Sequence, residues 1–177
     1  MPSNVDNFRQ HLSNFFVETG SYHGDGIQQA LDAGFKHVVS IELSPKYHAM
    51  CRDRFKDHPN VHLFLGESFK VLPKVLASLK QRATFWLDGH HSGGDTALGE
   101  HWAPLMQELD AIASHSIRDH IILIDDMRCW NAYNPTHGFE TADILDKLKT
   151  INPDYAFSYL DGHEKNDILV ARVQAPE

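Results

Sequence analysis

Three carboxylates in this chain come directly after short runs of large apolar residues. Asp88 follows the letters FWL, and the pair Asp125 and Asp126 follows IILI. Three carboxylates without a thiolate make an oxygen-donor site of the kind that Mg²⁺ prefers and that Ca²⁺ or Mn²⁺ can also occupy. Adjacent side chains on an extended chain point apart, so this pair can bind one ion only if the chain leaves strand geometry there. Otherwise the two are helix-capping acids. We expect a metal site at Asp88, Asp125 and Asp126.

Two adjacent histidines, His90 and His91, follow the first of these acids in the stretch LDGHHS. An imidazole with a near-neutral pKa can accept a proton from a substrate, which predicts His90 as a general base and His91 as the second choice. Metal binding and hydrogen bonding to substrate are alternative roles for His90. Asp88, His90 and His91 together also resemble a zinc ligand set, so a zinc-dependent hydrolase is the alternative enzyme class.

A glycine-rich segment, VETGSYHGDGI, carries Gly20, Gly24 and Gly26 between the first apolar run and the first helical pattern. Glycine lets the backbone turn sharply there and approach a ligand closely. The segment lacks the Gly-Lys-Ser/Thr of a P-loop and the GxGxxG spacing of dinucleotide sites. It is therefore either an ordinary strand–helix turn or part of another kind of nucleoside site.

Glu42 ends the second apolar run, 24 residues after Glu18. In Rossmann-like domains a carboxylate near this offset accepts hydrogen bonds from ribose hydroxyls, and its charge repels a 2′-phosphate. A solvated acid at the start of a helix is the alternative. Because the glycine-rich segment precedes it, we interpret Glu42 as a ribose-binding residue for an adenosine without a nearby phosphate.

Apolar runs alternate with amphipathic helical patterns along most of the chain. The expected strands are residues 15–17, 38–41, 61–65, 85–87, 120–124, 155–160 and 168–173. Helical patterns lie around residues 27–34, 44–55, 72–79, 105–112 and 139–148. Continuous apolar strands that alternate with helices predict a parallel sheet covered on both faces. The last two strands flank the turn DGHEKN and predict a hairpin, so the final strand runs antiparallel to its partner.

Acids mark the ends of the predicted parallel strands. Glu18, Glu42, Asp88 and Asp125 each follow or end a strand, and Glu67 lies just beyond the end of the remaining one. Open parallel sheets bind their ligands beyond the carboxyl ends of the strands. The sequence therefore predicts one acidic site along this edge.

Length, charge and hydropathy limit the function further. The 177 residues suit one domain over residues 1–177, with a core at about 15–173 and a short N-terminal extension at 1–14. A net charge of −8 argues against nucleic acid as a partner. The sequence shows no membrane-length apolar stretch, no signal-peptide pattern and no cysteine framework. We therefore expect a cytoplasmic protein without a membrane partner.

Five short motifs at the expected strand ends resemble those of the class I S-adenosylmethionine methyltransferases. They are ETGSYHGDG (18–26), SIELSP (40–45), LGES (65–68), WLDGH (86–90) and LIDD (123–126). Within that family the chain is most similar, over about residues 15–173, to metal-dependent O-methyltransferases of the catechol and the macrocin or sugar types. The resemblance implies an α/β fold with a Rossmann-like seven-stranded sheet. That sheet is mostly parallel, has an antiparallel C-terminal hairpin and carries helices on both faces.

The same resemblance implies roles for individual residues. Those expected to bind S-adenosylmethionine are Glu18, Gly20, Ser21, Tyr22, Gly24, Glu42, Leu43, Gly66, Glu67, Ser68 and Asp88. Residues 18–22 would flank its methionine part, Glu42 would bind the ribose, and Glu67 with Ser68 would border the adenine. Packing for Tyr22 and helix capping for Ser68 are the alternatives. The three aspartates of the metal site would hold Mg²⁺, which binds the acceptor oxygens and favours the deprotonated nucleophile.

The chain departs from that family at two points. His90 replaces the second acid of the DGD loop of the sugar type, and His91 replaces a lysine of the catechol type. Only about fourteen residues precede the first strand, so we expect the chain to lack the helical lid of many relatives. The loops 92–102 and 128–138, or a second subunit of a homodimer, would cover the substrate instead. We expect a small hydroxylated acceptor, a sugar or natural product rather than a catechol; a non-catalytic binding protein on this fold is the remaining alternative.

Overall fold

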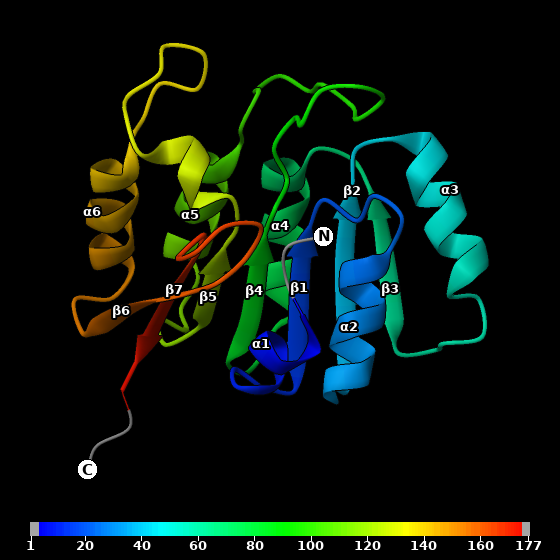
Figure 1. Ribbon diagram of the computed structural model, residues 1–177. Coiled ribbons are helices and arrows are strands. Elements are labelled where there is room, and N and C mark those ends of the chain that lie inside the picture. The colour runs from blue at the N-terminus through cyan, green and yellow to red at the C-terminus, as the bar shows by residue number, and fades with distance from the viewer. Residues whose placement is uncertain (1–3, 175–177) are drawn as a thin grey trace.

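The computed structural model describes residues 4–174, and within them seven strands form one sheet (Figure 1). The strands are β1 Phe15–Thr19, β2 His37–Glu42, β3 Val61–Leu65, β4 Ala83–Leu87, β5 Ile121–Ile124, β6 Tyr155–Leu160 and β7 Ile168–Val173. Their order across the sheet is β3-β2-β1-β4-β5-β7-β6. Strands β1 to β5 run parallel, and β7 runs antiparallel to both β5 and β6. The mostly parallel sheet with an antiparallel terminal hairpin is therefore confirmed.

Helices cover both faces of this sheet. They are α1 Val5–Arg9, α2 Asp25–Ala33, α3 Pro45–Arg54, α4 Ser68–Ser78, α5 Leu105–Ala113 and α6 Thr141–Ile151. Helices α1, α2 and α3 pack around Phe16 and Trp86 on one face, and α4, α5 and α6 pack around Val17 and Phe85 on the other. Successive side chains of a strand point to opposite faces, so adjacent residues pack into different hydrophobic cores. No helix within residues 4–174 is long and apolar enough to cross a bilayer.

The parallel register brings several strand ends together at one edge of the sheet. Thr19 pairs with both Ile41 and Leu87, and Leu87 pairs in turn with Ile124. The chain therefore leaves β1, β2, β4 and β5 side by side, at the upper edge in Figure 1. Two long loops rise from this edge: residues 88–104 before α5 (green) and residues 131–140 before α6 (yellow).

Short elements differ most from the prediction. Residues 5–9, expected in an extension, form α1, and its Phe8 is fully buried. Strand β1 continues two residues beyond Val17, so Glu18 lies inside the strand rather than after it. A 3-10 helix, η1 Met127–Trp130, follows β5 where no element was expected. One helical turn contains too few residues to show an apolar period, which is why the sequence pattern did not reveal these elements.

Candidate active site

A cavity of about 440 Å³ opens at the carboxyl ends of β1, β2, β3 and β4. Its walls are the turns that follow these strands and the 88–104 loop. Eight of the eleven residues expected to bind a cofactor line it: Gly20, Tyr22, Glu42, Leu43, Gly66, Glu67, Ser68 and Asp88. Motifs from four separate strand ends thus face one common space.

The carboxylate of Glu42 is held by two backbone N–H groups. Tyr22 donates to its Oε2 at 2.9 Å, and Ser44 donates to its Oε1 at 2.7 Å. The backbone of Tyr22 adopts a φ of 45°, in the left-handed region, as part of the turn that makes this contact. A carboxylate can accept about four hydrogen bonds, so Glu42 retains acceptor capacity for a diol in the cavity that it lines.

Gly20 allows the glycine-rich turn to lie directly against the end of β4. Its φ is 85°, and a Cβ at this position would clash with the backbone oxygen of Asp88. Both the conformation and the contact therefore require glycine. The close approach joins the turn and Asp88 in one wall of the cavity.

Glu18, Ser21 and Gly24 do not line the cavity, in contrast to the expected cofactor contacts. Glu18 is buried and accepts a hydrogen bond from Ser40, whose Oγ also lies 2.6 Å from Ser21 Oγ. Gly24 packs against the ring of Phe55. Burial raises the pKa of Glu18 to about 8. Glu18 lies within β1, and its side chain points toward α2 rather than into the cavity. It therefore packs beneath the glycine-rich turn, on the side away from the cavity.

The lining of the cavity is acidic. Four carboxylates line it, those of Glu42, Glu67, Asp88 and Asp95, and no lysine or arginine among residues 4–174 does. A phosphate group would be repelled by such a lining, whereas a positively charged ligand would be attracted.

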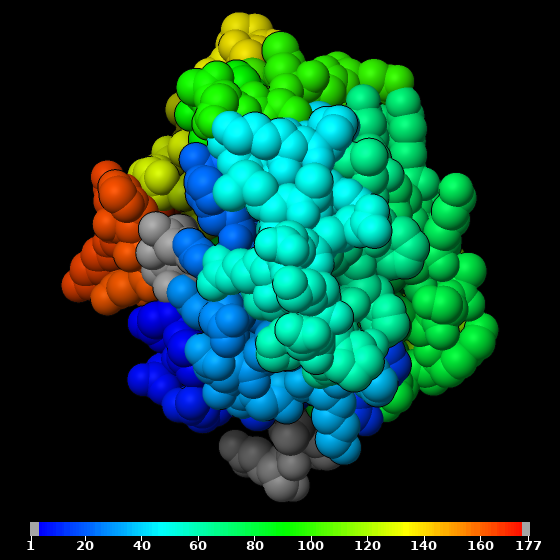
Figure 2. Space-filling view, turned by 90° about the vertical axis from the view of Figure 1, so that its right-hand side faces the viewer, coloured from blue at the N-terminus to red at the C-terminus, as the bar shows by residue number. Residues whose placement is uncertain are grey.

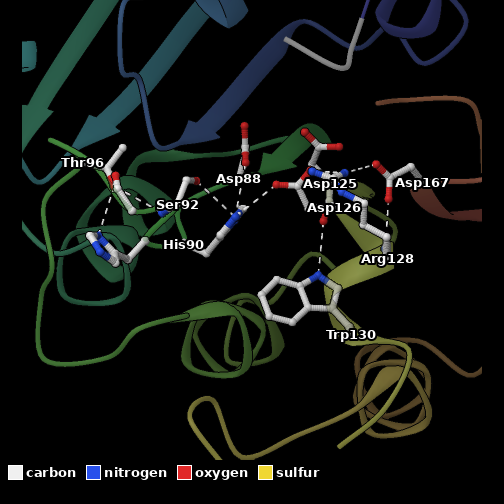
Figure 3. Close-up of polar contacts among 11 residues, drawn as sticks. Asp88, His90, Ser92, Thr96, Asp125, Asp126, Arg128, Trp130 and Asp167 are labelled. Carbon is white, nitrogen blue, oxygen red and sulfur yellow. Dashed lines mark hydrogen bonds and ion pairs between the residues drawn. The ribbon is translucent and has the colours of Figure 1, made fainter. Parts of the chain in front are cut away.

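Beside this cavity, Asp88, His90 and Asp126 form a compact polar cluster (Figure 3). His90 Nε2 lies 3.1 Å from Asp126 Oδ2, and His90 Nδ1 lies 3.7 Å from Asp88 Oδ1. One ligand atom of each residue lies within 4.8 Å of the others. Asp126 reaches the cluster because the chain turns at this residue, with a φ of 56°. This is the departure from strand geometry that a shared ion requires.

Asp125 belongs to a second cluster, with Asp126 and Asp167. Asp126 is thus shared by both clusters, while Asp88 and Asp125 lie in different ones. Asp125 is only 2% exposed, and neither of its carboxylate oxygens has a hydrogen-bond partner within the described part of the chain. The three predicted metal ligands therefore lie in adjoining clusters rather than in a single one.

The donor chemistry of these clusters fits a divalent cation. Burial, and then the neighbouring charge of Asp126, raises the pKa of Asp125 to about 8. Burial and the charges of Asp125 and Asp126 raise the pKa of Asp88 well above its usual range. Such shifts follow from burial and from the closeness of several carboxylates. A cation beside Asp126 would balance their negative charge, and carboxylate oxygens are the ligands that Mg²⁺, Ca²⁺ and Mn²⁺ take.

Arg128 and Asp167 complete this network and were not predicted from the sequence. Arg128 Nη1 lies 2.6 Å from Asp126 Oδ1 and also pairs with Asp167. The backbone N–H of Arg128 donates to Asp167 Oδ1 at 2.9 Å. The two residues are 39 positions apart and meet only where η1 lies beside the start of β7. No local spacing could therefore have connected them.

The two histidines have different surroundings. The ring of His90 packs against Trp102 and Trp130, at centroid distances of 5.9 and 5.6 Å. His91 lies in the 88–104 loop, where its Nδ1 is 3.1 Å from Thr96 Oγ1. Among the described residues, His91 belongs to neither potential metal cluster. The three-residue ligand set expected for a zinc hydrolase is therefore not assembled.

Glu108 is a further buried acid, and it was not among the site residues predicted from the sequence. It is 1% exposed, accepts a hydrogen bond from Ser68, and lies close to Gly89, whose added Cβ would come within 3.0 Å of Glu108 Oε1. Burial raises its pKa to about 7. Glu108 lies on the same face of α5 as Leu105 and Ile112. A charged side chain on a buried helix face needs a partner, so the helical period alone could have identified Glu108.

No family model matches the sequence, and no curated protein does. Solved structures do match it. The O-methyltransferase TomG from Streptomyces achromogenes, involved in tomaymycin synthesis and in complex with S-adenosylmethionine, aligns with a TM-score of 0.67 at 12% identity, covering 97% of this chain and 78% of its own. The S-adenosylhomocysteine-bound methyltransferase PaMTH1 from Podospora anserina aligns with a TM-score of 0.64 at 15% identity, and the alignment covers 97% of this chain and 76% of PaMTH1. CalS10 is an amino pentose methyltransferase from Micromonospora echinaspora involved in calicheamicin biosynthesis. It aligns with a TM-score of 0.59 at 12% identity, and the alignment covers 96% of this chain and 88% of CalS10.

At these identities the likeness establishes the fold. The aligned chains are methyltransferases, and the alignments extend over nearly all of this chain. Together with the strand order, they show that the chain has the Rossmann-like fold of the class I methyltransferases.

Proposed function

We propose that this chain is an S-adenosylmethionine-dependent O-methyltransferase that uses a divalent cation and acts on a small hydroxylated acceptor. The acidic lining of the cavity carries the proposal: four carboxylates line it, and among residues 4–174 no lysine or arginine does. S-adenosylmethionine combines a ribose diol with a positive sulfonium and carries no phosphate. A dinucleotide would instead bring phosphates into a negative cavity. The fold shared with methyltransferases supports the same assignment.

Glu42 is the residue that we assign to the ribose. Its two backbone contacts fix the carboxylate before a ligand arrives, which reduces the ordering cost of binding. Glu67 and Ser68, at the end of β3, border the part of the cavity assigned to the adenine. Gly20 and Asp88, which touch across the ends of β1 and β4, border the part assigned to the methionine.

Asp126 would hold the cation, with Asp88 as a further ligand on one side of it and Asp125 on the other. The shared position of Asp126, and the oxygens of Asp125 that find no hydrogen-bond partner among residues 4–174, support this assignment. When bound, the cation would orient the acceptor oxygens and favour a deprotonated hydroxyl. Arg128 and Asp167 keep Asp126 in place through their ion pairs.

His90 is the residue that we assign to accept the acceptor's hydroxyl proton. Among the histidines of the described chain, it alone forms ion-pair contacts with Asp88 and Asp126. Trp102 and Trp130 pack against its ring and limit its orientations. When bound, S-adenosylmethionine would supply the methyl group to the acceptor oxygen and leave as a neutral thioether. A ring nitrogen of His90 would accept the hydroxyl proton, and holding the reactants in line would be the main task of the protein.

The surroundings of His90 favour a sugar or a small natural product as the acceptor. Trp102 in the 88–104 loop is partly buried and packs against the ring of His90, as Trp130 does. Aromatic rings of this kind offer flat apolar surfaces with a polar edge, which suit a ring-shaped hydroxylated molecule. TomG and CalS10 are described as acting in tomaymycin and calicheamicin synthesis, which supports the same class of acceptor.

Isothermal titration calorimetry with S-adenosylhomocysteine, with and without Mg²⁺, tests the cofactor assignment. We expect binding in both conditions, and an absence of heat in both would exclude the assignment. Methyl transfer from S-adenosylmethionine to a panel of sugars and aromatic natural products then tests the activity. Turnover should stop with EDTA and return with Mg²⁺. Cofactor binding without turnover on any acceptor would instead identify a non-catalytic binding protein.

A further inference from the structure

We propose that the 88–104 loop is a lid over the nucleoside cavity, and that Asp95, acting through Tyr47, is the positioning residue that keeps this lid closed and retains the cofactor. The identity of the retained ligand rests on the proposed function. We call the contact of Asp95 with Tyr47 and Lys46 the latch, and the evidence for it is the set of contacts within the chain.

The 88–104 loop forms the outer wall of the cavity. Residues 92–97, Gly99 and His101 of this loop line the same space as the strand ends. Figure 2 shows this loop (bright green, at the top) lying over α3 (cyan). A nucleoside seated against Glu42 would therefore be enclosed between the sheet edge and the loop. Movement of the loop would open this wall of the cavity.

Two glycines near the tip of the loop make such movement feasible. Gly93 and Gly94 have φ values of 84° and 61°, and nothing lies within 4 Å of a Cβ built at either position. Neither glycine is needed for close packing, so their left-handed conformation serves the path of the loop. The tip is therefore held by its polar contacts rather than by packing at these two positions.

Asp95 is the residue at the tip that contacts the body of the domain. Its carboxylate accepts hydrogen bonds from the hydroxyl of Tyr47 and, at 2.8 Å, from Nζ of Lys46. Tyr47 is 1% exposed, so its ring is held firmly at the start of α3 while its hydroxyl meets the loop. The hydrogen bond to Asp95 raises the pKa of Tyr47 to about 12. The hydrogen bonds from Lys46 and then from Tyr47 lower the pKa of Asp95 to about 2.

Tyr47 also connects this latch to the residues assigned to the ribose. Its ring lies 4.5 Å, centroid to centroid, from the ring of Tyr22. Tyr22 in turn donates its backbone N–H to Glu42. Asp95, Tyr47, Tyr22 and Glu42 all line the cavity. The closed loop and the ordered Glu42 carboxylate therefore belong to one continuous set of contacts.

A second contact anchors the loop closer to α5. Glu67 Oε1 accepts the backbone N–H of Glu100 at 3.0 Å, and the side chain of Glu100 pairs with Lys70. The loop is thus tied to α3 at its tip and to the start of α4 near its end. Loss of Asp95 should free the tip while the second anchor remains.

The test compares Asp95→Asn and Tyr47→Phe with Asp110→Asn, a matched control. Asp110 forms an exposed ion pair with Lys147 at 2.6 Å, and neither residue lines the cavity. Amide hydrogen exchange of the ligand-free proteins should rise in residues 90–97 for the two latch variants alone. Stopped-flow release of S-adenosylhomocysteine should become about tenfold faster in each, as expected for the loss of one charge-assisted hydrogen bond.

The double variant and a conservative variant sharpen this test. Asp95→Asn combined with Tyr47→Phe should release the ligand no faster than Asp95→Asn alone, because Asp95→Asn already weakens the contacts of Asp95 with both Tyr47 and Lys46. Asp95→Glu should restore most of the slow release. The lid proposal would be contradicted if Asp95→Asn and Asp110→Asn showed the same amide hydrogen exchange and the same rate of S-adenosylhomocysteine release. A wild-type protein that binds no S-adenosylhomocysteine would overturn the cofactor assignment instead, while hydrogen exchange would still decide whether the latch exists.

Discussion

His90 Nε2 lies 3.1 Å from Asp126 Oδ2, although the two residues follow different strands of the sheet. The contact joins the loop after β4, which also lines the cavity, to the acidic clusters at the end of β5. The proposed proton acceptor and the candidate cation site therefore adjoin the place assigned to the methionine part of the cofactor. This arrangement makes the proposed methyl transfer testable residue by residue.

Replacement of His90 by asparagine should lower kcat about 10²- to 10⁴-fold, the usual contribution of a positioned general base. The affinity for S-adenosylhomocysteine should stay nearly unchanged, because Glu42 and the adenine end of the cavity are untouched. Turnover rates and calorimetry measure the two effects separately. His91→Asn is the control, since His91 contacts Thr96 within the loop rather than the acids. Equal losses of kcat in both variants would contradict the assignment of His90.

Replacement of Glu42 by glutamine should weaken binding of S-adenosylhomocysteine by about tenfold or more. One carboxylate oxygen becomes an NH₂ group, which would face the backbone N–H of Tyr22 or Ser44. Calorimetry of the variant beside Asp110→Asn measures the change. An unaltered dissociation constant would show that Glu42 does not contact the ligand.

Mg²⁺ should stabilise the wild-type protein against unfolding, since an ion that binds only the folded state shifts the equilibrium. At about 100 times its dissociation constant the gain is about 2.7 kcal/mol. Asp126→Asn removes the acid shared by both clusters, so this gain should disappear, whereas Asp110→Asn should keep it. Urea unfolding with Mg²⁺ or with EDTA provides the measurement. Full Mg²⁺ stabilisation in Asp126→Asn would rule out this cation site.

His120 should make the protein less stable in mild acid. It is fully buried before β5, Ala83 donates its backbone N–H to His120 Nδ1 at 3.1 Å, and His115 Nδ1 lies 2.8 Å from its Nε2. Burial, and then the charge of His115, lowers the pKa of His120 to about 4. Between that value and its ordinary pKa of 6.5 the unfolded chain binds the proton and the folded chain does not. The free energy of unfolding should therefore fall by up to about 3 kcal/mol as the pH drops through this window.

Urea titrations of the wild type and of His120→Phe at several pH values measure this effect. The variant loses the acceptor for Ala83 and is expected to be less stable throughout. Its stability should nevertheless depend less on pH between 4 and 6.5. Parallel pH profiles for the two proteins would assign the acid sensitivity to other groups.

Periodicity predicted the sheet well because each central strand is a continuous apolar run between helical patterns. Strand β3 at Val61–Leu65 and the hairpin strands β6 and β7 have the predicted bounds. Glu18 shows what periodicity did not predict, namely where a strand ends. Two further residues of pairing extend β1 through Thr19, and the side chain of Glu18 then turns toward α2 instead of the cavity.

The candidate site could be predicted in part. Asp88, Glu42 and Glu67 line the cavity because the carboxyl ends of parallel strands share an edge. Asp167 and Glu108 lie far from these motifs in the sequence and reach the site only through tertiary packing. Their burial, rather than any spacing, marks them.

The sequence by itself determined the order of strands and helices, the acids at the strand ends and the glycines that allow a close turn, because these depend on local propensity and on the two- and 3.6-residue periods. Only the tertiary structure decided which histidine meets the acids, which carboxylates share a cluster and which loop lines the cavity. Those outcomes depend on distances between side chains from separate elements. His90 and His91 are neighbours in the chain, yet His90 contacts Asp126 while His91 contacts Thr96 in the loop.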